Sequence, residues 1–269
     1  MRQPRNGYTA VKNHKKTVPS LVLFSIGALL GTPSTHAQSS STLDNKTTAS
    51  EQLAFYNPTE RGGSWLTTWN EATRGEPLNV VVSGNSDPSI LEYDGFIDWS
   101  YSLSFSPQCF HWYDEGAQQA ADLKDGNGLR NQTTILRYNY QDPIFGACGQ
   151  SLQGGEHFRV FRQNGTEMGT GAWFLAASKE HNLGKKHMIL PNGYDLGRDE
   201  IVSLATNPRG TRSPVSKALY STSVKAVQGP TYFGDLRVDE INHGIMIDGR
   251  IAVLTVSVLE KGDGSKPLV

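Results

Sequence analysis

The sequence predicts an α+β (mixed α/β) fold, in which a predominantly antiparallel sheet and a few short helices form a single compact domain. Three observations favour this class. Runs of β-branched and aromatic residues of strand length recur along the chain between Gly, Asn, Asp and Pro. Short polar turns join several of these runs, which is typical of antiparallel hairpins. Segments with the apolar spacing of a helix are fewer and short.

The start of the chain has the pattern of a secretory signal peptide. Basic residues within 1–16 precede the apolar run 21–30, and small residues follow it. Thr35 and Ala37 fit the small-x-small pattern of a cleavage site, so we predict a signal peptide over residues 1–37. The run is shorter than the about 20 apolar residues of a comfortable bilayer span. We therefore expect a secreted, extracellular protein without a membrane span after cleavage, and an uncleaved signal anchor is the alternative.

Charge narrows the classes of partner. Without residues 1–37 the chain has 20 Lys and Arg against 26 Asp and Glu, a net charge of about −6. An acidic chain without a basic patch is a poor match for nucleic acid or an anionic membrane. Residues 38–54 are rich in Ser and Thr and predict a flexible tail. The folded domain is expected over residues 55–269, which is long enough to bury a substantial core.

The two cysteines are expected to form a disulfide. Cys109 and Cys148 are the only ones in the chain, and an even number in a secreted protein favours pairing. Three Asn-x-Thr sequences begin at Asn45, Asn131 and Asn164. These are acceptors for N-linked glycans, so they predict surface positions if a eukaryote secretes the chain.

The first elements are predicted from short local patterns. Trp65 and Trp69 are four residues apart, a spacing that would place both on one face of a helix. The apolar run 78–82 predicts a strand that ends at a Ser-Gly-Asn turn. Residues 88–99 follow it and predict a helix, because Pro88 suits the first turn and an apolar stripe follows.

The middle of the chain predicts a loop-rich segment and then a hairpin. Residues 109–148 are rich in Gly, Asn, Asp and Gln, and 133–138 is their one clear strand. We interpret this segment as an excursion closed by the disulfide. The runs 156–162 and 172–178 are joined by a turn over 163–171 and predict a pair of antiparallel strands.

The last third predicts one helix and two strand regions. Residues 195–205 have helical spacing, with Asp195 as the expected N-cap. The β-branched runs 215–227 and 245–259 predict strands. We expect the Asp-Gly pair at 248–249 to break the second run as a hairpin turn.

Arg198 is the cation whose position most needs an explanation. At about 100° per residue it falls in the middle of the apolar arc of the helix, whereas Asp199 lies toward its edge. A guanidinium stays charged and needs an anionic partner when buried. Either Arg198 clamps a phosphate or carboxylate ligand, or it forms an internal ion pair with Glu156, Asp195 or another carboxylate.

His157 and Arg159 form a second candidate. Strand alternation places them with Phe161 on one face, opposite the face of Arg162. The neighbouring run is apolar on both faces, so this layer is expected to be partly buried. A histidine beside an arginine suits general acid catalysis, and it also suits a buried carboxylate partner. The catalytic candidates are therefore His157, Arg159, Arg198 and Asp199, and the ligand-binding candidates are Arg159, Arg162, His187 and Arg198.

No cofactor or metal is predicted. His157, His187, Asp195 and Asp199 offer nitrogen and oxygen ligands, but no His-Glu-x-x-His or cysteine-pair spacing accompanies them. A Gly-x-Ser-x-Gly elbow, a phosphate-binding loop and a dinucleotide fingerprint are all missing from the sequence. The aromatic segment 111–114 would either offer a sugar-stacking surface or pack over the disulfide, and we favour packing.

The segment that carries these charges resembles a known family. His157-x-Arg159-x-x-Arg162, an apolar strand, the region of His187, and Gly-Tyr-Asp-x-Gly-Arg-Asp at 193–199 before a helix are similar to the LssY C-terminal-like domain. The similarity covers about residues 75–210. In that family the domain often accompanies membrane-embedded phosphatase-like or transporter-like regions. Its own activity is not established, so the resemblance implies a domain identity and no reaction.

Two functional hypotheses follow from these residues. In the first, the protein is a secreted glycoprotein built on this domain, whose arginines hold an anionic small molecule or lock the fold. In the second, it is a secreted hydrolase of phosphate esters or glycans. His157 would then act as acid and base, and Arg159 and Arg198 would hold the charge of the substrate.

Overall fold

The computed structural model describes residues 54–69, 75–110, 112–113, 116–142, 145–228, 233 and 236–265. The predicted signal peptide, the tail apart from Ala54, and the sequon at Asn45 lie outside these residues. Within them, no helix is long and apolar enough to span a membrane.

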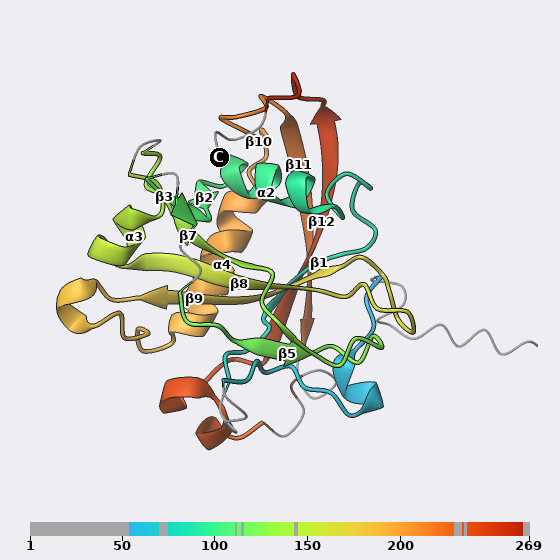
Figure 1. The fold of residues 1–269 in the computed structure, drawn as a ribbon, viewed down its shortest axis with the longest axis vertical. Helices are drawn as coiled ribbons and strands as arrows, with labels where there is room; N and C mark the ends of the chain where they lie inside the picture. The colour runs from blue at the N-terminus through green and yellow to red at the C-terminus, as the bar shows by residue number, and fades with distance from the viewer. Residues whose placement is uncertain are drawn as a thin grey trace, which may run out of the picture. The chain divides into compact units, whose positions relative to one another are not determined.

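The described residues are organised around one sheet of eight strands, in the order β10-β11-β12-β1-β9-β8-β7-β2. Strands β8 and β9 run across the view of Figure 1, whereas β11 and β12 run nearly vertically, which shows how strongly the sheet twists. The strands of this sheet are Val80–Val82 (β1), Phe105–Ser106 (β2), Thr134–Tyr138 (β7), Gly155–Arg162 (β8), Trp173–Glu180 (β9), Thr211–Arg212 (β10), Leu219–Gln228 (β11) and Arg250–Glu260 (β12).

Antiparallel pairing dominates this sheet. All neighbouring strands are antiparallel except β1 and β12, which are parallel. Two small antiparallel pairs lie outside the sheet and join Gln108–Cys109 (β3) to Trp112–Tyr113 (β4) and Ala120–Asp122 (β5) to Leu129–Asn131 (β6). The α-helices of the described residues are short: Tyr93–Ser102 (α2), Cys148–Gln153 (α3) and Gly193–Ala205 (α4). The α+β class is therefore confirmed.

Short 3-10 segments connect these elements within the described residues. Their bounds are Pro58–Arg61 (η1), Leu183–Lys185 (η2), Val238–Glu240 (η4) and Asn242–Gly244 (η5).

The sheet is covered on both faces, and alternation along its strands decides which residue serves which face. Val80 and Val82 pack with Phe96 of α2 and Ile201 of α4. Val81, between them in the sequence, faces the other way and belongs to the second core, which contains Phe55, Trp65, Leu123, Phe161 and Phe174. Helices thus cover one face, and loops with the β5-β6 pair cover the other.

The predicted hairpin at the centre of the chain is confirmed. Strands β8 and β9 pair in an unbroken antiparallel register from Gly155↔Glu180 to Arg162↔Trp173. His157, Arg159 and Phe161 share the face of β8 that sequence alternation gives them, and Phe158 and Val160 lie in the opposite core. The predicted strand 133–138 is also present as β7, which pairs with β8.

Trp65 and Trp69 do not share a helix. Leu66 and Thr68, between them, form isolated bridges with Pro77 and Ala120. Trp65 is buried, whereas Trp69 is about half exposed. In an extended segment a separation of four residues says little about burial, so the expected common face was wrong.

The first predicted helix begins later than expected. Residues 88–92 form successive turns, closed by bonds such as Ile90 N–H to the Asp87 carbonyl oxygen, and α2 starts only at Tyr93. The predicted strand before it, 78–82, is reduced to β1.

Helix α4 starts two residues before the predicted position. Its N-cap is Asn192, which has a left-handed backbone and makes no side-chain capping bond, so Asp195 is not the cap. Gly197 lets this helix lie close to β9, because a Cβ atom there would come within 2.5 Å of the backbone of Ser178.

The Asp-Gly pair at 248–249 is not a hairpin turn. Residues 245–249 have no strand structure, and β12 begins at Arg250 and runs unbroken to Glu260. The predicted strand 215–227 is found as β11, which pairs with β12 along its length.

Candidate functional site

Arg198 is held by three carboxylates of the protein. Its side chain is 3% exposed, and its two terminal nitrogens donate to the two Asp248 oxygens at 2.6 and 2.9 Å. Its Nε donates to Asp199 at 2.8 Å, and Asp195 lies at 3.4 Å. The Arg250 carbonyl oxygen accepts a further bond of 3.1 Å. The guanidinium is therefore fully occupied by internal partners.

The electrostatics of this cluster agree with its geometry. Burial lowers the pKa of Arg198, but hydrogen bonds to Asp248 and Asp199 outweigh it and raise that pKa. Burial raises the pKa of Asp248, and its bonds with Arg198 and Arg250 lower it further than burial raises it. The internal-pair interpretation of Arg198 is the one that this geometry supports. Glu156 is not the partner, since it pairs with Lys179.

Arg159 is also enclosed by its own protein. Its Nε donates to Glu76 at 3.2 Å, and one terminal nitrogen donates to Gln132 and to the Ala117 carbonyl oxygen, both at 2.7 Å. Gln119 donates to the other oxygen of Glu76 at 2.8 Å. All four side chains of this network, those of Glu76, Gln119, Gln132 and Arg159, are buried. A fully bonded buried network favours a unique packing of the fold.

His157 lies in the same buried layer. Its ring is 1% exposed, the Ser178 hydroxyl is 3.3 Å from Nε2, and Glu180 is 3.6 Å from Nδ1. Burial lowers the pKa of His157 well below its usual value, and the positive charges of Arg137 and Arg159 lower it further. The histidine is therefore neutral at physiological pH.

Ser178, His157 and Glu180 are the residue types of a hydrolase triad, but the geometry does not suit that role. Both ring nitrogens lie at nearly the same distance from the Ser178 hydroxyl, 3.4 and 3.3 Å, so the hydroxyl sits beside the ring rather than in line with one nitrogen. Ser178 is completely buried. A substrate has no access to this hydroxyl in the described structure.

His187 and Asp199 lie near the surface. His187 Nδ1 is 3.8 Å from Glu180, and Asp199 is mostly exposed beside Arg198. Glu180 therefore links His157 and His187, whereas Arg198 shares no partner with either histidine. Among the described residues, no group of three or more His, Cys, Asp or Glu side chains is arranged to hold a metal ion.

Arg162 differs from the other candidates because it lines a pocket of about 490 Å³. The pocket is formed by residues of β5, β6, β8 and β9, by Tyr93 at the start of α2, and by the loops around residues 125 and 164. Its aromatic lining residues are Tyr93, Phe161 and Trp173, and its charged ones are Asp125, Arg130 and Arg162.

Arg162 is only lightly held in place. Its guanidinium carbon lies 4.9 Å from the ring centre of Trp173, in a cation–π contact. Its terminal nitrogens donate to Glu92 at 3.0 and 3.4 Å, and the Glu92 side chain is 71% exposed. Its buried Nε has no hydrogen-bond partner among the described residues. Exposed ion pairs of this kind contribute about 0–1 kcal/mol, so the arginine can exchange its partner.

Two arginines and one aspartate are the charged residues that line the pocket. Arg130 is exposed and has no side-chain partner among the described residues. The Asp125 carboxylate is bonded within the surrounding loops. Its two oxygens accept hydrogen bonds from the backbone N–H groups of Asn127, Asn164 and Gly165. Of the two arginines that line the pocket, Arg162 is therefore paired with Glu92, and Arg130 is the one without a side-chain partner among the described residues.

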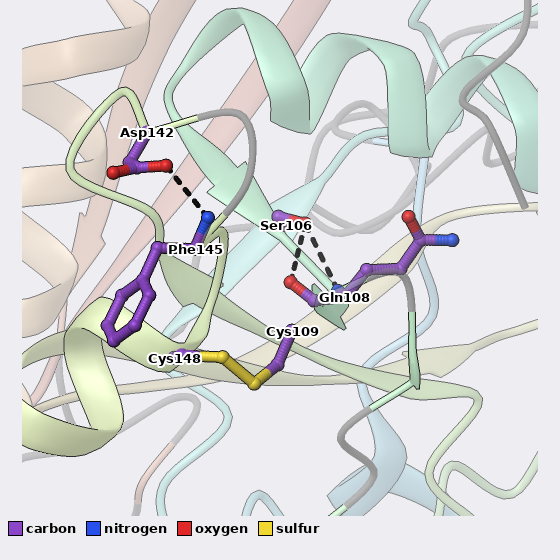
Figure 2. The surroundings of a disulfide bond; sticks show 6 residues. All are labelled: Ser106, Gln108, Cys109, Asp142, Phe145 and Cys148. Carbon is purple, nitrogen blue, oxygen red and sulfur yellow. Dashed lines mark hydrogen bonds between the residues drawn. A yellow bond between two sulfur atoms is a disulfide. The ribbon is translucent and has the colours of Figure 1, made fainter.

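The predicted disulfide between Cys109 and Cys148 is present and joins β3 to the start of α3 (Figure 2). Asp142 accepts a bond from the backbone of Phe145 beside it. Trp112 is 80% exposed, so it does not pack over the disulfide and that part of the interpretation was wrong. Residues 111 and 114 of the same aromatic segment lie outside the described part.

Comparison of the chain with protein-family models, with curated proteins and with solved structures found no match. The resemblance to the LssY C-terminal-like domain therefore stays a prediction.

Several partners in these clusters had no signal in the sequence. Glu76 and Asp248 each lie about fifty residues or more from the arginine that they bind, and neither belongs to a recognisable motif. Ser178 and Glu180 belong to the strand pattern of β9, and that pattern did not mark them as partners of His157. Strand alternation alone would have placed Glu180 on the same face as Ser178.

Proposed function

We propose that this protein is a secreted glycoprotein that binds an anionic small molecule, and that the ligand occupies the pocket lined by Arg162. The observation that carries the proposal is the difference between the bonding partners of the three arginines. Arg198 and Arg159 are themselves buried and are bonded to internal partners, whereas Arg162 is bonded to one exposed carboxylate at the edge of a pocket. Of the cations that the sequence singles out, Arg162 is the one best placed to meet a ligand.

The contacts of Arg162 suggest how a ligand would bind. The face of the guanidinium lies on Trp173, which leaves its N–H edge for a carboxylate or phosphate group. The Glu92 carboxylate occupies that edge in the structure. An anionic ligand would replace the Glu92 carboxylate, which then returns to water at little cost because its side chain is already exposed.

The lining favours a ligand with a flat apolar part. Phe161 and Tyr93 supply aromatic surface, and Arg130 offers a second positive charge. Pockets with apolar walls and a few placed polar groups are typical of small-molecule sites. Phenyl phosphate and its neutral analogue phenol are therefore suitable probes.

Calorimetric titration of the unglycosylated protein tests the proposal. We expect phenyl phosphate to bind more tightly than phenol, and Arg162→Gln to weaken it by about tenfold or more, since a charge-assisted bond contributes about 1.5–3 kcal/mol. Arg212→Gln is the matched control, because Arg212 also forms an exposed pair, with Glu260 at 2.7 Å, and does not line the pocket. Equal binding of both probes, or no effect of Arg162→Gln, would refute the proposal.

The same probe separates this proposal from the hydrolase hypothesis. Phenyl phosphate is a phosphate ester, and its hydrolysis releases phenol and inorganic phosphate. The burial and neutral state of His157 support binding without turnover. Release of phenol that disappears in His157→Gln while the fold is retained would instead support the hydrolase.

A further inference from the structure

We infer that N-linked glycans at Asn131 and Asn164 close the Arg162 pocket, so that glycosylation regulates access to it. The two sequons are 33 residues apart in the sequence, yet both asparagines line this one pocket. Thr133, the third residue of the first sequon, lines it as well. The inference rests on the proposed function where it concerns ligand affinity, and on the geometry alone where it concerns access.

Both asparagines are placed so that a glycan can be attached and tolerated. Asn131 lies in the edge strand β6, is exposed, and has no side-chain partner among the described residues. Asn164 is exposed too, and its Oδ1 accepts a bond of 3.1 Å from Asn127. That bond leaves Nδ2, the atom that carries an N-linked glycan, free of partners within the described part of the chain. Attachment would therefore break no contact of the fold.

Glycans at these two positions would block access to the arginines of the pocket. Asn131 follows Arg130 directly on β6, and Asn164 lies two residues beyond Arg162 at the end of β8. A bulky, hydrated glycan at either asparagine would stand at the rim beside a pocket cation. The glycan would then hinder a solute that approaches Arg130 or Arg162. Two glycans, one at each asparagine, would exclude the solute more strongly than one.

The experiment compares the same chain from a glycosylating eukaryotic host and from the periplasm of a bacterial host. Mass spectrometry of glycopeptides first measures occupancy, and we expect glycan on Asn131 and Asn164. Phenylglyoxal, which modifies accessible arginines, then reports access without any ligand. We expect labelling of Arg130 to be about tenfold slower in the glycosylated protein, at unchanged labelling of the exposed Arg212.

Variants assign the effect to particular glycans. The double variant Thr133→Ala/Thr166→Ala removes both acceptor sequences and should restore rapid labelling in the eukaryotic host. Thr47→Ala, which removes the sequon at Asn45, is the matched control and should leave labelling slow. Because Thr133 lines the pocket, the double variant is also made in bacteria, where it should behave as the wild type does.

The outcomes separate this inference from the proposed function. Unoccupied asparagines in the eukaryotic host, or equal labelling of Arg130 in both forms, would overturn the inference. If bacterial protein fails to bind phenyl phosphate, the proposed function fails, and the labelling rates still decide whether glycans close the pocket. If it binds, glycosylated wild type should bind about tenfold more weakly, and the double variant should recover that loss.

Discussion

Arg198 and Asp248 form a two-pronged ion pair that ties helix α4 to the start of strand β12. The two residues are 50 positions apart, and their bonds of 2.6 and 2.9 Å run in parallel from guanidinium to carboxylate. Asp195 strengthens the connection by accepting a bond from the Asp248 backbone N–H at 3.1 Å. Without Asp248 the buried guanidinium of Arg198 would keep only two carboxylates, those of the more distant Asp195 and the exposed Asp199.

Replacing Asp248 should therefore destabilise the fold. Removing one partner of a buried pair costs about 3–5 kcal/mol, and the partial exposure of Asp248 reduces the expected loss for Asp248→Asn to about 1–3 kcal/mol. Urea denaturation measures it. Glu260→Gln, which breaks the exposed pair with Arg212, is the control and should change the free energy of unfolding little. Equal effects of the two variants would show that the Arg198 cluster does not hold the fold.

The buried His157 should make stability depend on pH. Its folded-state pKa lies below the value of 6.5 expected for the unfolded chain, so its contribution is fully present above pH 6.5 and is lost as the pH falls. The free energy of unfolding should drop below pH 6.5 with a slope of up to about 1.4 kcal/mol per pH unit from this group.

His157→Gln should flatten that slope below pH 6.5, and the introduced amide can still bond with Ser178. An unchanged slope in His157→Gln would mean that other groups cause the pH dependence.

Glu92→Gln should tighten the binding of phenyl phosphate. The Glu92 carboxylate competes with the ligand for the edge of Arg162, and a neutral amide competes less. We expect a gain of about two- to fivefold, because an exposed pair contributes up to about 1 kcal/mol, and no measurable change in melting temperature. Calorimetry measures the first quantity and thermal denaturation the second. Weaker binding in Glu92→Gln would place the ligand elsewhere.

Loss of the disulfide should lower stability. Cys109 and Cys148 are 39 positions apart, and in the chain-entropy model closing such a loop contributes about 4 kcal/mol. Cys109→Ser/Cys148→Ser should therefore unfold at lower urea concentration, with an unchanged pocket affinity for phenyl phosphate in the native state. A double variant as stable as the wild type would show that the loop is already ordered in the unfolded chain.

The strands of the fold could be predicted well because their signals are local. In β8 the alternation of His157, Arg159 and Phe161 with apolar neighbours is visible in eight residues, and β9 follows after a polar, Gly-containing connection. The helix of Arg198 was also visible. Its exact start was not, because the left-handed Asn192 has no capping side-chain bond that a sequence pattern would reveal.

The site was harder to predict because it depends on distant contacts. The pocket brings Tyr93 of α2 to the ends of β6 and β8, and no local pattern encodes that meeting. The same reason explains the error at 248–249. An Asp-Gly pair has the composition of a hairpin turn, but here Asp248 binds Arg198, and residues 245–249 have no strand structure.

The parallel pairing of β1 with β12 affects how the chain must fold. Val81 lies beside Val253 at the centre of the sheet, although 172 positions separate them. While a ribosome is still making the chain, β1 has no neighbour on that side until almost the whole domain has emerged. The strands from β1 to β2 in the sheet order can pair earlier, but the sheet is completed only after β12 has been synthesised, and such non-local pairing makes folding slow.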